Sequence, residues 1–87
     1  MKFTVVWMAS AQRELARLWT DQADRAAITA AANAIDVRLS RDPERLGESR
    51  EDEMRVLIAA PLTVFFRVRV DDRMVEVVSV KYIARRD

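Results

Sequence analysis

Residues 62–83 read LTVFFRVRVDDRMVEVVSVKYI and set the architecture of the chain. Two runs rich in β-branched and aromatic residues flank three polar residues at 71–73. Alternation of side chains between two faces predicts strands at 62–70 and 74–83. The Asp-Asp-Arg segment between them predicts a tight turn, because Asp tolerates left-handed backbone better than most residues. The stretch is therefore expected to form an antiparallel β-hairpin.

The two strands of this hairpin differ in regularity. The first has one face of Val64, Phe66, Val68 and Val70 and another of Phe65, Arg67 and Arg69. The second changes phase, since Val75 and Val77 lie on one face whereas Val78 and Val80 lie on the other. Either both faces of this strand are partly covered or a β-bulge shifts its register.

Two further strands complete the predicted sheet. Residues 55–59 predict a strand that joins the hairpin through a turn at Ala60-Pro61. Because the connections are short, the last three strands form an antiparallel meander. Near the N-terminus, the alternation of Phe3, Val5 and Trp7 predicts a fourth strand. The pattern allows this strand to pair at either edge of the meander.

Two helices are predicted between the first strand and the meander. Ser10 is expected to cap the start of the first helix by accepting a bond from a backbone N–H. The apolar stripe of that helix consists of Ala11, Leu15, Leu18 and Trp19. Asp21 and Asp24 follow it and can begin a second helix, because carboxylates are favoured at the N-terminal end of the helix dipole.

The second helix is predicted over residues 25–39, which are rich in Ala, the best helix former. One face of this helix carries Ile28, Ala31, Ala32, Ile35 and Leu39. It ends at Asp42-Pro43, because Pro disfavours helical geometry in the residue before it. The two helices are expected to form a helical hairpin.

The element order is thus β-α-α-β-β-β in one α+β domain that spans residues 1–87. We expect the helical hairpin to pack on one face of a mostly antiparallel four-stranded sheet and to leave the other face open. Residues 44–53 are polar and contain the only Gly, so they are expected to form a surface loop.

Composition excludes several classes of chemistry. The chain has no Cys and no His, so disulfides, thiolate or imidazole metal sites and Ser-His or Cys-His nucleophile pairs are excluded. We expect no cofactor, no metal site and metal-independent chemistry if the protein is an enzyme. No apolar run approaches the roughly 20 residues that span a bilayer, so a cytoplasmic protein without a membrane partner is expected.

Charge is distributed unevenly along the chain. Residues 1–53 carry 8 Lys or Arg against 10 Asp or Glu, a net of −2, whereas residues 54–87 carry 7 against 4, a net of +3. The C-terminal part is therefore the expected surface for an anionic partner.

Four segments in this order resemble the RelE/ParE toxin superfamily. They are Val5-Val6-Trp7 with Ala11, Leu15 and Leu18; Asp42-Pro43 with Gly47; Arg55-Val56-Leu57 with residues 61–68; and residues 75–80. The resemblance covers nearly the whole chain and implies a type II toxin that stops growth until a cognate antitoxin masks it. RelE-like members cut mRNA in the ribosomal A site, ParE-like members poison DNA gyrase, and some members have no established activity.

Three functions follow from the resemblance. The residues 81–87 resemble the Arg-Asp ending of many ParE-like members, which favours DNA gyrase as the target. The alternative is a ribosome-dependent mRNA endonuclease. Such an enzyme needs a base, a phosphate-stabilising cation and an acid, and the candidates are Arg67, Lys81, Tyr82 and Arg85. The third is a non-toxic binding or regulatory module with the same fold.

The resemblance to ribosome-dependent nucleases is weaker at two positions of the sequence. Ribosome-dependent members usually have a basic segment before the central hairpin, where this chain has acidic residues 51–53. The Arg that they carry at the start of the third strand is replaced here by Leu62-Thr63. Lys81 and Tyr82 are also neighbours in one strand, so a regular strand would point them to opposite faces.

Two binding surfaces are predicted on the open side of the sheet. The target- or anion-binding residues are Arg55, Arg67, Arg69, Arg85 and Arg86. The antitoxin-binding residues are Met54, Leu57, Phe65 and Val78, which would form an exposed apolar area unless the chain itself covers them. The expected partners are the antitoxin, gyrase or the ribosome with mRNA, and in addition a second copy in a homodimer or hetero-oligomer.

Overall fold

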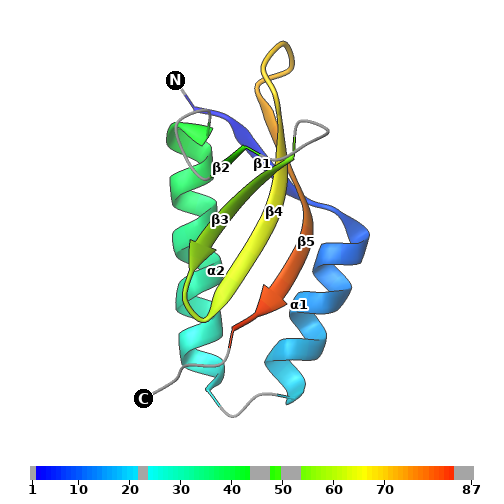
Figure 1. Cartoon of the computed structure of the whole chain (residues 1–87), viewed down its shortest axis with the longest axis vertical. Helices are drawn as coiled ribbons and strands as arrows, with labels where there is room; N and C mark the ends of the chain where they lie inside the picture. Colours follow the sequence, from blue (N-terminus) through cyan, green and yellow to red (C-terminus); the bar gives the residue numbers. More distant parts are fainter. Residues whose placement is uncertain (1, 22–23, 44–47, 50–53, 84–87) are drawn as a thin grey trace.

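A computed structural model describes residues 2–21, 24–43, 48–49 and 54–83 (Figure 1). Two helices and five strands follow the predicted order, with one short strand added. The elements are β1 (Thr4–Trp7), α1 (Ala9–Asp21), α2 (Arg25–Arg41), β2 (Glu48–Ser49), β3 (Arg55–Ala59), β4 (Leu62–Arg69) and β5 (Met74–Tyr82). The predicted α+β fold is confirmed.

The strands form one sheet in the order β1-β5-β4-β3-β2. The last three long strands form the predicted antiparallel meander, and β1 pairs with β5 in parallel. The edge that the sequence pattern left open is therefore the β5 edge. Residues 44–53 were expected to be loop throughout, but Glu48–Ser49 pairs with β3 as a two-residue strand. The other residues of that segment lie outside the described residues.

Both helices pack on the same face of the sheet. Their buried residues join those of the strands in one core cluster, which contains Ala11, Leu18, Ile28, Ala31, Ile35, Leu39, Leu57, Leu62, Val64, Phe66, Val75, Val77 and Val80. The face of α2 predicted from the sequence lies in this cluster, with Ala32 half-buried at its margin. The alternation of β4 therefore separates a helix-covered face from an open one. Val70, predicted on the covered face, lies beyond the end of β4 and is exposed.

A β-bulge in β5 explains the change of phase in its sequence. Phe65 pairs with Ser79 whereas Phe66 pairs with Val77, so Val78 is the extra residue. The bulge brings Val75, Val77 and Val80 to the same buried face. Of the two explanations that the pattern allowed, the bulge is confirmed.

The helix boundaries confirm one predicted cap and correct the other. Asp24 caps α2, because its Oδ1 accepts a bond of 3.1 Å from the backbone N–H of Ala27. Ser10 does not cap α1, since the helix begins one residue earlier at Ala9. The Ser10 hydroxyl instead donates to the carbonyl of Val78 at 3.0 Å, which links α1 to the bulge of β5.

The hairpin turn lies where it was predicted, but a different residue carries the left-handed backbone. Arg73 has a positive φ of 49°, whereas the prediction assigned that role to the Asp residues. The Arg73 N–H closes the turn by donating to the carbonyl of Val70 at 3.1 Å. The turn at Ala60-Pro61 is also confirmed, with a cis peptide bond.

Candidate functional site

The open face of the sheet carries the predicted cations of β4. We call this surface the open sheet face and define it by the side chains of β4 and β5 that alternate with the core: Thr63, Phe65, Arg67, Arg69, Met74, Glu76, Ser79 and Lys81. Arg67 lies opposite Glu76 in the register, and Arg69 lies opposite Met74. The predicted sharing of one strand face by the two arginines is confirmed.

Glu76 bridges these two arginines. The Arg69 Nε donates to Glu76 Oε1 at 2.9 Å, and the Arg67 Nη2 lies 3.4 Å from the same oxygen. The Glu76 side chain is only 13% exposed, whereas those of Arg67 and Arg69 are 41% and 52% exposed. The hydrogen bond from Arg69 to Glu76 raises the pKa of Arg69 above its ordinary value, and the charges of Glu76 and Asp72 act in the same direction.

Two buried polar atoms on this face have no hydrogen-bond partner within the described part of the chain. They are Thr63 Oγ1 and Arg67 Nε. An unsatisfied buried donor is costly, so such atoms mark places where a further partner would be favoured. Arg67 thus keeps donor capacity that Glu76 does not use.

The other predicted cationic and catalytic residues do not converge on one site. Lys81 pairs with Thr63 and is exposed on the open sheet face, whereas Tyr82 pairs with Leu62 and packs against the core on the helix side. Arg55 pairs with Phe66, which places it on the helix side as well. Arg85 and Arg86 lie outside the described residues. Of the predicted set, the structure brings together Arg67 and Arg69 and adds Lys81 further along the same face.

The predicted apolar area for the antitoxin needs one correction. Leu57 is only 6% exposed, because its side chain points to the helices and packs in the core opposite Val64. It therefore cannot line an exposed surface of this chain. Met54, Phe65 and Val78 are half-buried. Ile58, which was not predicted, lies on the open side of β3 and is 62% exposed.

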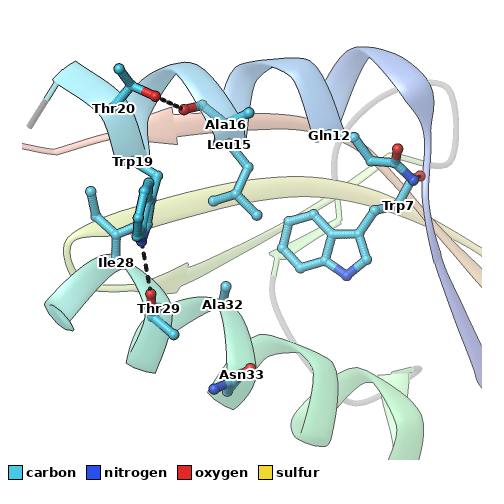
Figure 2. A pocket seen from close by; sticks show the side chains of 10 residues that line it. All are labelled: Trp7, Gln12, Leu15, Ala16, Trp19, Thr20, Ile28, Thr29, Ala32 and Asn33. Atoms are coloured by element: carbon cyan, nitrogen blue, oxygen red, sulfur yellow. Dashed lines mark hydrogen bonds between the residues drawn. The ribbon is translucent and has the colours of Figure 1, made fainter. Parts of the chain in front are cut away.

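A concave surface lies between the two helices, and we call it the helix groove (Figure 2). This cavity of about 480 Å³ is lined by Trp7, Gln12, Leu15, Ala16, Trp19, Thr20, Ile28, Thr29, Ala32 and Asn33. Figure 2 shows the Trp19 indole bridging towards α2, where its Nε1 donates to Thr29 Oγ1 at 3.1 Å. The Trp7 Nε1 donates to Asp36 Oδ1 at 2.8 Å. These two bonds fix the indole rings that form part of the groove wall.

The apolar periodicity of the two helices did not predict the helix groove. Trp19 was assigned to the apolar stripe of α1, but it is 45% exposed. The Arg25 guanidinium lies 4.8 Å from the centre of its ring and covers part of it. A sequence signal is nevertheless present, because residues 26–35 of α2 contain no charged residue although part of that stretch faces outward.

Within the described ranges, there is no group of three or more His, Cys, Asp or Glu residues that could hold a metal ion. None of the described helices is long and apolar enough to cross a membrane.

Comparison of the fold with solved structures gives clear matches. The toxin–antitoxin complex RelBE2 from Mycobacterium tuberculosis aligns with a TM-score of 0.80 over 98% of this chain and 95% of that chain, at 20% identity. The chain therefore has the RelE/ParE toxin fold. The ParDE system of P. aeruginosa matches this fold with a TM-score of 0.66 at 14% identity, over 95% of this chain and 98% of that chain.

The isolated RelE toxin of E. coli shows the same fold, with a TM-score of 0.59 and 14% identity over 98% of this chain and 88% of that chain. No family model and no curated protein sequence matches the chain. The RelE/ParE fold expected from the sequence is thus confirmed by structural likeness, across RelE and ParE structures alike.

Proposed function

We propose that this protein is the toxin of a type II toxin–antitoxin system, a growth inhibitor that a cognate antitoxin neutralises by direct binding. The observation that carries this proposal is the likeness to a chain of the toxin–antitoxin complex RelBE2, over 98% of this chain and 95% of that chain. The likeness to the ParDE system supports the same class of protein. The proposed site of action is the bacterial cytoplasm.

DNA gyrase is the proposed target. Cleavage of RNA without a metal requires a base and an acid on either side of one phosphate. Lys81 and Tyr82 lie on opposite faces of β5, so the chain does not assemble that pair from them. This separation favours a toxin that acts by binding.

A ribosome-dependent mRNA endonuclease is the second candidate. The observation that favours it is the presence of three cationic side chains, Arg67, Arg69 and Lys81, on the open sheet face. Cations on one surface can neutralise phosphates of an RNA strand, which is the main source of affinity for nucleic acid.

Controlled expression in a bacterial host distinguishes these targets. We expect the wild-type protein to arrest growth, to induce the DNA-damage response and, when purified, to inhibit supercoiling by gyrase. Rapid cleavage of mRNA at the ribosome, detected by primer extension, would assign the endonuclease function instead. Normal growth after verified expression of folded protein would reject the toxin proposal and leave a non-toxic binding module.

The proposed antitoxin surface is centred on Phe65 of the open sheet face, and Met54 and Val78 are the other half-buried residues proposed for it. The helix groove is a second surface for the same partner, because it is preformed and exposes part of Trp19. Exposed apolar areas of this kind are typical of partner sites. A disordered antitoxin segment that folds on binding could cover both.

Binding to the cognate antitoxin tests these two surfaces. We expect Phe65→Ala and Ala16→Glu each to weaken binding roughly fivefold or more, as for interface residues that contribute more than about 1 kcal/mol. Ala34→Glu is the matched control, because Ala34 is exposed on α2 but does not line the groove. Unchanged affinity of the Phe65 variant would reject the sheet surface, and unchanged affinity of the Ala16 variant would reject the groove.

A further inference from the structure

Glu76 is the least exposed member of the charged cluster on the open sheet face. A single carboxylate oxygen, Oε1, receives the Arg69 Nε at 2.9 Å and lies 3.4 Å from the Arg67 Nη2. Two guanidinium groups thus converge on one oxygen atom. This is the arrangement that two arginines adopt around an oxyanion, with the anion supplied here by the protein itself.

We propose that Arg67 and Arg69 form a phosphate-binding site that Glu76 occupies in the isolated protein and that a phosphate group fills by displacing the Glu76 side chain. This inference rests on the proposed function in one respect, because the site lies on the face that is proposed to bind the target. Glu76 is therefore an internal competitor, which lowers the affinity of the face for phosphate until a stronger ligand displaces it.

The number of N–H donors that Arg67 and Arg69 offer favours a phosphate over another carboxylate as the ligand that displaces Glu76. Arg67 Nε is buried and without an acceptor in the described structure, so Glu76 leaves part of the available donor capacity unused. A guanidinium presents its N–H groups in a fork that matches two oxygens of one phosphate. A phosphate group carries more acceptor oxygens than a carboxylate, so it can receive bonds from both forks at once.

Displacement of Glu76 is energetically accessible. The Glu76 side chain is 13% exposed, but those of Arg67 and Arg69 are 41% and 52% exposed, so water reaches the ion pairs from the arginine side and lowers their net contribution to stability. The core on the opposite face of β4 and β5 does not depend on the pair, because Phe66, Val75 and Val77 are fully buried against the helices. The guanidinium groups can therefore exchange one anion for another while the sheet stays intact.

The test measures phosphate binding in matched charge variants of the purified full chain. The probes are inorganic pyrophosphate and a fluorescein-labelled ten-nucleotide thymidine oligonucleotide, at low salt. Glu76→Gln is the key variant and Asp72→Asn is its control, because each substitution removes one negative charge. Asp72 acts on Arg69 only through its charge, whereas Glu76 also accepts a hydrogen bond from it.

We expect E76Q to bind the probe about fivefold more tightly than wild type, because the Glu76 carboxylate no longer competes for the two guanidinium groups. D72N should change the affinity less than twofold, and Arg67→Ala with Arg69→Ala should abolish binding in the E76Q background. Tighter binding of the oligonucleotide alone would identify a nucleic-acid backbone as the source of the phosphate, and tighter binding of both probes would identify a free phosphate group as sufficient. Equal gains in E76Q and D72N, or no gain in E76Q, would overturn the proposal.

A measurement on the wild-type chain avoids any dependence on variant folding. The Arg69 Nε–H and Glu76 carboxyl resonances should both shift when pyrophosphate saturates the protein, because their mutual hydrogen bond breaks. Unshifted resonances at saturation would also overturn the proposal. Growth arrest by the wild type combined with a negative binding result would reject this inference alone, whereas a positive binding result with normal growth would reject only the toxin function.

Discussion

Phe65 and Phe66 are neighbours in β4 but have different roles in the protein. Phe66 is fully buried between the sheet and the helices, whereas Phe65 is half-buried on the opposite side of β4. Alternation along a strand produces this difference from adjacent positions. The stability of the fold therefore depends on Phe66, and Phe65 is available for contacts with a partner.

Truncation of each phenylalanine tests this division. We expect Phe66→Ala to lower the free energy of unfolding by about 3–5 kcal/mol, because it removes buried apolar surface and leaves a cavity. Phe65→Ala should cost less than half as much, since much of that side chain already contacts water. Urea unfolding followed by circular dichroism measures both values. Equal costs would show that the open sheet side is as closely packed as the core.

The cap of α2 is a second effect at this scale. Asp24→Ala removes the acceptor of the Ala27 N–H and should lower the free energy of unfolding by about 1 kcal/mol. In a domain of this size that corresponds to a decrease in Tm of roughly 4–8 °C. Asp21→Ala is the control, because Asp21 is the last residue of α1 and caps no helix start. An equal decrease in the control would assign the effect to charge rather than to capping.

Elements are held together by contacts that the sequence pattern does not reveal. The bulge in β5 was one of two explanations for its change of phase, but its link to α1 through the Ser10 hydroxyl was not expected. Such a bond joins residues 68 positions apart and depends on the packing of a helix against a strand. Local rules instead favoured Ser10 as a helix cap.

We expect Ser10→Ala to lower the free energy of unfolding by about 1 kcal/mol, the usual net value of one intramolecular hydrogen bond. Amide hydrogen exchange should become faster in β5 around the bulge. Ser40→Ala is the matched control, because the Ser40 hydroxyl donates to the carbonyl of Val37 within the same helix. Unchanged exchange in the Ser10 variant would show that the bulge is stable without this contact.

At the candidate site, too, the sequence predicts what alternation along one strand determines, but not what depends on contacts between elements. Alternation correctly placed Arg67 and Arg69 on one face and separated Lys81 from Tyr82. It did not identify Glu76 as the partner of both arginines, because that contact depends on the register that the hairpin turn sets between β4 and β5. Leu57 was misplaced because a strand of five residues with apolar side chains on both faces does not reveal which face is covered.

The whole molecule is a sheet with helices on one side and a charged, partly apolar surface on the other. Its fold is shared with the toxins of RelBE2 and ParDE at identities of 20% and 14%. A shared fold does not fix a shared function, so the target depends on the side chains of the open sheet face. The central claim is that the arginines of this face contact the target.

Growth inhibition by the double variant Arg67→Ala, Arg69→Ala tests that claim most directly. The core lies on the opposite face of the sheet, so the circular dichroism spectrum should be unchanged, but Tm should fall because the 13%-exposed Glu76 carboxylate loses both of its cationic partners. We expect the folded variant to permit normal growth at an expression level at which the wild-type protein arrests it. Growth arrest by the variant equal to that by the wild type would contradict the account.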